Sequence, residues 1–142
     1  MINAYKNPAS TVDLVILCEE GIVLIKRKNE PFRGYWALPG GFLENGKETL
    51  EEAASRELFE ETNLTANPRE LKLIGVYSNP RRDPRGHVIS HAYEVINYSG
   101  KLKAKDDAED IETFRILPSR LAFDHKKILE NYFRYKQIGG RR

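Results

Sequence analysis

Residues 49–63 constrain the fold most, because they carry every local signal of an α-helix. Thr49 and Glu52 form a capping-box pattern, and Asn63 can adopt the left-handed conformation that ends a helix. At about 100° per residue, the small and apolar side chains fall on one stripe: Leu50, Ala53, Ala54 and Leu58. We therefore predict an amphipathic helix over Thr49–Thr62 that packs on a core.

The same helix carries carboxylates on the face that should be buried. Glu57 and Glu61 lie within about 20° of Leu50, and Glu60 lies at the stripe's edge beside Arg56. Glutamate-rich helix faces are usually solvated, but carboxylates one turn apart on an apolar face repel each other and lose hydration. A hard divalent cation with oxygen ligands would compensate them, and Arg56 could hold one of them through a bidentate contact.

Short apolar runs on both sides of this helix predict strands. The first two are joined by a turn at residues 19–21, and a second helix, capped by Asp124, reaches about Gln137. Its Ile128, Leu129, Tyr132 and Phe133 should pack on the sheet. The expected strands are Thr11–Leu17, Ile22–Ile25, Tyr35–Leu38, Leu71–Tyr77, Val88–Ile96 and Ile111–Leu117. The fold class is α/β of the α+β type, a mixed β-sheet sandwiched between helices.

Length and composition narrow the class of protein. The 142 residues suit one domain, 1–142, and the net charge of +2 gives no reason to expect nucleic acid as a partner. No apolar run is long enough for a membrane span, and the polar residues 1–10 predict no signal peptide. The lone Cys18 allows no internal disulfide, which suits a cytoplasmic protein.

At residues 41–64 the chain resembles the Nudix box. That pattern requires Gly, five residues, Glu, seven residues, Arg-Glu, an aliphatic, any residue, Glu-Glu, any residue, Gly and an aliphatic; here it reads GFLENGKETLEEAASRELFEETNL. Six residues rather than five separate Gly41 from Glu48, and Asn63 replaces the second Gly. The Arg-Glu-Leu-x-Glu-Glu core is intact.

Other segments are similar to the ADP-ribose pyrophosphatase branch of that family. They are WALPGG at 36–41, RDPRGH at 82–87, DDA at 106–108 and LAFDH at 121–125. The resemblance implies hydrolysis of a nucleoside diphosphate linked to another group, with ADP-ribose cleaved to AMP and ribose 5-phosphate. It also implies Mg²⁺, with Mn²⁺ as the alternative, and a homodimer.

The chemistry assigns roles to individual residues. The expected metal ligands are Glu57, Glu60, Glu61 and the carbonyl of Gly40, while Glu48 adds a ligand or supports Arg56. The general base is a box glutamate or an acid of the loop that carries Asp106, Asp107, Glu109 and Asp110, of which Glu109 is chosen. Arg56, Glu57, Glu60, Glu61 and Glu109 form the predicted catalytic set.

The substrate is expected to bind through a second set of side chains. Arg82 and Arg85 would clamp the diphosphate, Asp83 would accept hydrogen bonds from sugar hydroxyls, and Arg27 and Arg33 are further candidates. The base would stack on one of four aromatic residues, Tyr5, Phe32, Tyr35 or Tyr77. His87, His91 and His125 lack metal-ligand spacing and are interpreted as structural.

Two alternative functions stay open. The first is a Nudix hydrolase of other nucleoside diphosphate sugars, (d)NTPs or dinucleoside polyphosphates, against which residues 82–87 argue. The second is a regulator that senses ADP-ribose. We expect too few residues after position 125 for a DNA-binding winged helix, and such sensors tend to lose the box glutamates that this chain keeps.

Overall fold

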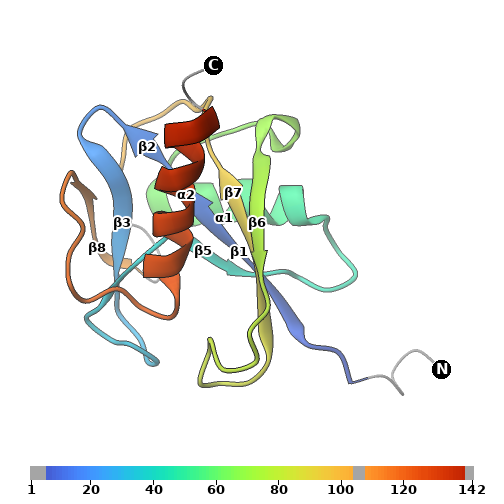
Figure 1. Ribbon diagram of the computed structural model, residues 1–142. Helices are drawn as coiled ribbons and strands as arrows, with labels where there is room; N and C mark the ends of the chain where they lie inside the picture. The colour runs from blue at the N-terminus through green and yellow to red at the C-terminus, as the bar shows by residue number, and fades with distance from the viewer. Residues whose placement is uncertain (1–5, 104–107, 140–142) are drawn as a thin grey trace.

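A computed structural model describes residues 6–103 and 108–139, with side chains for 6–103 and 110–137. Within these described residues, eight strands, two α-helices and a 3₁₀ turn follow one another (Figure 1). In order they are β1 (Ala9–Val15), β2 (Leu17–Cys18), β3 (Gly21–Arg27), β4 (Trp36–Ala37), β5 (Gly40–Phe42), α1 (Leu50–Thr62), η2 (Pro68–Glu70), β6 (Lys72–Tyr77), β7 (Val88–Glu94), β8 (Ala108–Phe114) and α2 (His125–Gly139).

The strands form two four-stranded sheets rather than one. The first has the order β5-β1-β7-β6 and is mixed, because β1 pairs with β7 in parallel while the other neighbours are antiparallel. In the second, β2 and β4 pair with the two ends of β3, and β8 pairs along most of its length. The expected mixed α+β architecture is confirmed, with a second sheet that the sequence pattern did not indicate.

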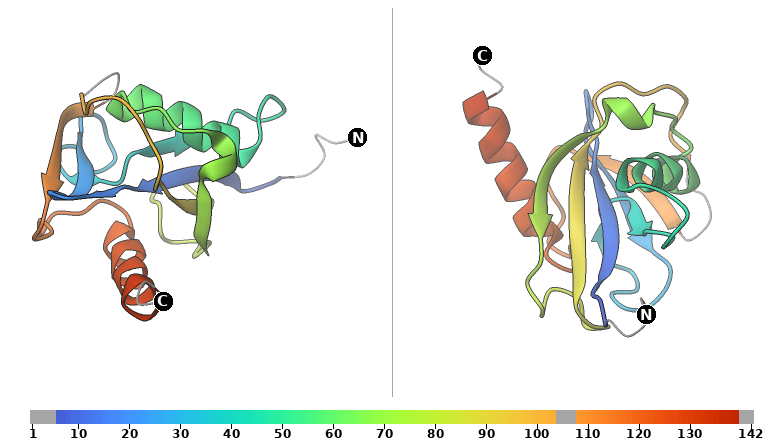
Figure 2. Two further views of the ribbon diagram at one scale, coloured as in Figure 1. Left: turned by 90° about the horizontal axis from the view of Figure 1, so that it is seen from above. Right: turned by 90° about the vertical axis from the view of Figure 1, so that its right-hand side faces the viewer.

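The two helices cover opposite faces of the strands (Figure 2). Ala53, Ala54 and Leu58 of α1 pack on Val12 and Leu14 of β1. Ile128, Leu129 and Tyr132 of α2 pack on the other side, in a cluster with Val15 and Leu24. Because side chains alternate along a strand, Asp13 points to the α2 side of β1, as Val15 does. This alternation places a carboxylate inside the molecule next to the beginning of α2.

Helix α1 begins and ends where its local signals predict. The Thr49 side chain accepts a hydrogen bond from the Glu52 amide while the Glu52 carboxylate accepts one from the Thr49 amide, and Asn63 has φ 71°. Glu57 and Glu61 are buried, Glu60 is half-buried, and Glu51 and Glu52 are exposed. The predicted helical face is therefore confirmed.

Three local predictions were wrong. Residues 40–42 form strand β5, which the expected strands did not include, and its pairing with β1 brings Gly40 opposite Asp13. Strand β8 begins at Ala108, so Glu109 and Asp110 belong to a strand and not to a loop. Phe133 is 40% exposed and does not pack on the sheet as its helical neighbours do.

No helix among the residues that the structure describes is long and apolar enough to cross a membrane. The single-domain organisation, the homodimer and the cytoplasmic location stay predictions.

Candidate active site

Arg56 organises the acidic residues of α1. It donates Nε–H and Nη2–H to the two carboxylate oxygens of Glu48 at 3.0 and 2.8 Å. Its Nη1 donates to Glu57 Oε2 and to Glu60 Oε1, both at 3.0 Å, and its Nη2 also donates to the Phe42 carbonyl at 3.1 Å. The guanidinium group thus fixes three carboxylates and one end of β5 around itself.

Glu57 is the acid whose protonation the fold alters most clearly. Burial raises its pKa to about 7, although the Arg56 charge and hydrogen bond act in the opposite direction. Gly41 lies against it, because a Cβ built at Gly41 would be 2.2 Å from Glu57 Oε2. Only glycine allows the backbone of β5 to approach the carboxylate this closely.

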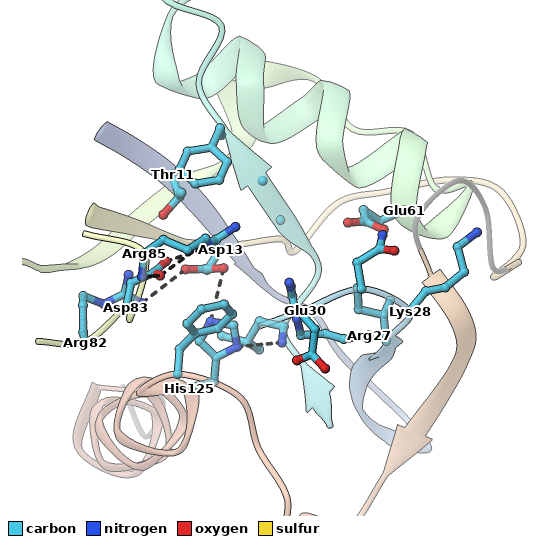
Figure 3. Close-up of a pocket in the computed structure, with 17 residues that line it drawn as sticks. Thr11, Asp13, Arg27, Lys28, Glu30, Glu61, Arg82, Asp83, Arg85 and His125 are labelled. Atoms are coloured by element: carbon cyan, nitrogen blue, oxygen red, sulfur yellow. Dashed lines mark hydrogen bonds and ion pairs between the residues drawn. The ribbon is translucent and has the colours of Figure 1, made fainter. Parts of the chain in front are cut away.

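The far end of the same acidic face opens into a cavity of about 240 Å³. Glu61 lines it together with Gly40 and Gly41 of β5, and Arg27 enters it from the end of β3 (Figure 3). The loop between β6 and β7 contributes Arg82, Asp83 and Arg85. One cavity therefore brings together two of the four expected metal ligands and four of the five candidates for substrate binding, without Arg33.

No three His, Cys, Asp or Glu side chains within the described part of the chain gather in a geometry ready to hold a metal ion. The contacts explain this finding, because Glu57 and Glu60 both direct an oxygen to Nη1 of Arg56. The residue types nevertheless fit a hard cation, since carboxylate and carbonyl oxygens are its preferred ligands. Burial raises the pKa of Glu57 to about 7 despite the nearby Arg56, and a cation bound at Glu57 would favour its charged form.

Arg85 and Asp83 form a closed pair at the mouth of the cavity. Arg85 donates Nε–H and Nη2–H to the two oxygens of Asp83 at 3.0 and 2.8 Å, and its backbone amide donates to Oδ1 at 2.9 Å. The Asp83 side chain is buried, whereas that of Arg85 is 41% exposed. This geometry supports a role for Asp83 in orienting Arg85; its contact with sugar hydroxyls stays a prediction.

Arg82 lies in a different environment from Arg85. Its side chain is only 3% exposed, and it donates Nε–H and Nη2–H to the two oxygens of Asp124 at 2.9 and 2.6 Å. A second carboxylate, that of Asp13, lies 3.8 Å from Nη2. Arg82 thus fastens the 78–87 loop to the start of α2, and a direct contact with substrate stays a prediction.

The sequence reasoning missed a buried polar network in the wall of the cavity, which Asp13 and His125 both line. His125 accepts a hydrogen bond from the Leu38 amide on Nδ1 at 3.0 Å, which leaves its proton on Nε2, 3.4 Å from Asp13 Oδ1. Ser90 donates its hydroxyl to Asp13 Oδ2. Burial would raise the pKa of Asp13, but His125, Ser90 and Arg82 together hold it below its usual range. The signal was an aspartate inside the apolar run TVDLVIL.

The remaining predicted residues lie as follows. Phe32 and Tyr35 pack edge to face with ring centres 5.4 Å apart, and the Tyr77 hydroxyl accepts a hydrogen bond from Asn131. Arg33 is exposed. Tyr5, Asp106 and Asp107 lie outside the described residues, as does the side chain of Glu109. His87 and His91 contact the Ser78 and Thr11 carbonyls, as structural histidines do.

The NUDIX domain family matches residues 7–135 of this chain. The chain belongs to the Nudix family. It is 54% identical to the ADP-ribose pyrophosphatase of Methanocaldococcus jannaschii over 134 residues, which are 93% of this chain and 77% of that protein. It is also 34% identical to the ADPR responsive transcriptional repressor NtrR of Acinetobacter baylyi over 91% of this chain, but it spans only 54% of that repressor.

Solved Nudix structures share the fold. The NUDIX domain of Shewanella oneidensis NrtR, crystallised with ADP ribose, superposes with a TM-score of 0.79 at 28% identity and covers 93% of this chain and 90% of that one. A bifunctional NMN adenylyltransferase/ADP ribose pyrophosphatase of Francisella tularensis, complexed with AMP and Mn ion, gives a TM-score of 0.80 at 31% identity, covering 92% of this chain and 42% of that one. This chain is therefore a Nudix hydrolase in sequence and in fold.

The extra residue in this Nudix box does not displace Glu48. The turn at 45–47 contains Gly46 at φ 76°, and Glu48 still binds Arg56 with both oxygens. Its carboxylate also accepts the Glu44 amide at 2.9 Å. Of the two roles expected for Glu48, the structure shows the support of Arg56.

Proposed function

We propose that this Nudix hydrolase cleaves ADP-ribose to AMP and ribose 5-phosphate with a bound divalent cation. The observation that carries the proposal is the shared cavity, in which Glu61 of the acidic face and Gly40 of β5 meet Arg27 and Arg85. A diphosphate in this cavity would contact guanidinium groups on one side and carboxylates on the other. The contact between phosphate and carboxylate oxygens is favourable only when a cation lies between them, so this cavity links substrate binding to metal binding. The 54% identity to an ADP-ribose pyrophosphatase supports the choice of substrate.

We propose Mg²⁺ as the cation, with Mn²⁺ as the alternative. Glu57, Glu60, Glu61 and the Gly40 carbonyl would hold it, and once bound it would neutralise phosphate oxygens and lower the pKa of a bound water. Arg56 orients Glu57 and Glu60, since its Nη1 donates hydrogen bonds to both carboxylates. Because Arg56 remains bound to both oxygens of Glu48, it can keep its position while the other two carboxylates turn to a cation.

Arg27 and Arg85 would bind the two phosphates. Arg85 is held by Asp83, and Arg27 donates Nε–H to the Pro31 carbonyl at 2.7 Å, so each guanidinium group is fixed before substrate binds. Fixed donors lose little freedom on binding and stabilise charge that develops on the phosphate oxygens. Glu109 remains the proposed general base, and a box glutamate is its alternative.

A coupled phosphatase assay tests the proposal. Both products carry a terminal phosphate that an added phosphatase releases, whereas the diphosphate of ADP-ribose is protected at both ends. We expect the highest kcat/KM for ADP-ribose among ADP-ribose, nucleoside diphosphate sugars, dNTPs and dinucleoside polyphosphates. Glu61→Gln should lower turnover by orders of magnitude, and the exposed Glu52→Gln is its matched control on the same helix. A preference for a dNTP would refute ADP-ribose as the substrate but would not contradict the assignment as a hydrolase.

Removal of metal tests the cation separately. Exhaustive chelation should abolish turnover, and Mg²⁺ or Mn²⁺ should restore it; full activity after chelation would overturn the metal proposal. Tight binding of ADP-ribose without hydrolysis, with metal present, would instead favour a sensor.

We also propose that the protein is a homodimer. Sedimentation velocity at working concentration tests this proposal, and the presence of monomer alone would contradict it.

A further inference from the structure

Phe123 has a backbone conformation that its side chain does not favour. It lies just before α2 with φ 53°, and Phe32, which packs edge to face on it with ring centres 4.9 Å apart, has φ 63°. Bulky residues rarely occupy the left-handed region, and where they do the surrounding structure holds them there, often at a functional site. Asn63, at φ 71°, needs no such explanation because it ends a helix.

This conformation presents the Phe123 ring to two arginines at the cavity. The Cζ atom of Arg27 lies 5.1 Å from the ring centre and that of Arg85 lies 5.5 Å from it. Both distances suit an attraction between a guanidinium group and an aromatic ring. Arg85 also lies 4.9 Å from the ring of Phe42. Since all four side chains line the same cavity, the rings and the cations belong to one site.

The two guanidinium groups lie near the same ring and repel each other. Burial lowers the pKa of Arg27, and the nearby charge of Arg85 lowers it further, while Glu61, Asp83 and Asp13 act in the opposite direction. Two fixed cations that face one cavity gain most from a ligand with two adjacent negative groups. A single phosphate offers less, because it cannot place one phosphoryl group before each cation.

We propose that Phe123 is a positioning residue that holds Arg27 and Arg85 together as a clamp for a diphosphate. The inference rests on the proposed function for its biological substrate, although the clamp itself recognises any diphosphate. Under this proposal the Phe123 ring gives the clamp its preference for binding a diphosphate over a monophosphate. Phe123 acts through the arginines and needs no contact with the reacting atoms.

Isothermal titration of the protein in saturating Mg²⁺ with inorganic pyrophosphate and with orthophosphate tests the clamp, because the cation offsets the carboxylates that face a diphosphate in the cavity. Phe123→Leu should weaken pyrophosphate binding about tenfold, the size expected when two contacts between cation and ring are lost at a partly desolvated site. It should also reduce the preference for pyrophosphate over orthophosphate. Phe123→Tyr keeps the ring and should retain the affinity. Phe114→Leu is the matched control, because Phe114 pairs with Trp36 and does not line the cavity.

A double-mutant cycle identifies the route of the effect. In a protein that already carries Arg27→Ala and Arg85→Ala, Phe123→Leu should change pyrophosphate affinity little, since the ring then has no cation to hold. If Phe123→Leu does not unfold cooperatively, Phe123→Met, which fills a similar volume without a ring, takes its place. An undetectable affinity of the parent protein for pyrophosphate, an unchanged affinity in both variants, or an equal loss in Phe114→Leu would overturn the clamp.

These results are separable from the fate of the proposed function. If pyrophosphate binding depends on Phe123 but the protein does not cleave ADP-ribose, the clamp is supported and the proposed function is refuted. If the protein cleaves ADP-ribose but pyrophosphate binding does not depend on Phe123, the proposed function is supported and the clamp is refuted.

Discussion

Replacing Glu57 by Gln removes a carboxyl group that the fold holds in an unfavourable place. In the metal-free protein its pKa is about 7, against an ordinary value of 4.5, and burial is the main cause. Each unit corresponds to about 1.4 kcal/mol, so ionised Glu57 opposes folding by roughly 3 kcal/mol. The amide that replaces the carboxyl group carries no charge, whatever the pH. We therefore expect Glu57→Gln to stabilise the metal-free protein at neutral and alkaline pH.

The sign of the effect follows from the two pKa values. Below pH 4.5 the carboxyl is protonated in both the folded and unfolded chains and contributes no penalty. Between pH 4.5 and about 7 the unfolded chain ionises first, so the parent protein loses stability as pH rises. Above pH 7 the penalty is complete. The advantage of Glu57→Gln should grow from near zero at pH 4.5 to about 2–3 kcal/mol at pH 8, after allowance for the lost contact with Arg56.

Urea unfolding in chelator at pH 4.5, 5.5, 7 and 8 measures this difference. Glu48→Gln is the opposite control, because Arg56 lowers the pKa of Glu48; this variant should be the less stable one at pH 7 and approach the parent on acidification. Saturating Mg²⁺ should favour the parent over Glu57→Gln, since only the carboxylate binds the cation well. A stability difference that does not change with pH, or a less stable Glu57→Gln at pH 8 without metal, would refute the reasoning.

Two further predictions concern stability. Arg82→Ala should lower the free energy of unfolding by about 3–5 kcal/mol in chemical denaturation, because it leaves Asp124 without its bidentate partner beside Asp13. A variant with unchanged stability and a raised KM would show that Arg82 binds the substrate instead. Gly40→Ala should cost several times more thermal stability than Gly46→Ala, because a Cβ at Gly40 would lie 2.1 Å from the Val12 carbonyl oxygen. A Cβ at Gly46 would meet no atom within 4 Å, so only the φ of 76° opposes that substitution. Equal melting temperatures would contradict this close approach.

Two arginines of the 78–87 loop, Arg82 and Arg85, lie in different environments. Arg82 is buried and bound to the helix start, whereas Arg85 reaches the cavity mouth. Sequence resemblance treats both as a single clamp. The structure pairs Arg85 with Arg27 instead, through the ring that lies close to both.

The sequence by itself determined helix α1 and its acidic face. The capping box, the left-handed Asn63 and the 3.6-residue period are local properties, and they placed Glu57 and Glu61 on the buried side. The Nudix box added the chemistry, since its Arg-Glu-Leu-x-Glu-Glu core survives here. Short apolar runs likewise predicted most strands within a few residues of their observed ends.

Only the tertiary structure decided how distant residues meet. Strand β5 is short and glycine-rich, so its pairing with β1 has no local signal. His125 binds the Leu38 amide 87 positions away, and Arg82 binds Asp124 across 42 positions. Phe123 faces both Arg27 and Arg85 because strand β3, the 78–87 loop and the start of α2 converge at one cavity. Local patterns cannot specify such contacts, because they arise from the packing of elements that are remote in the chain.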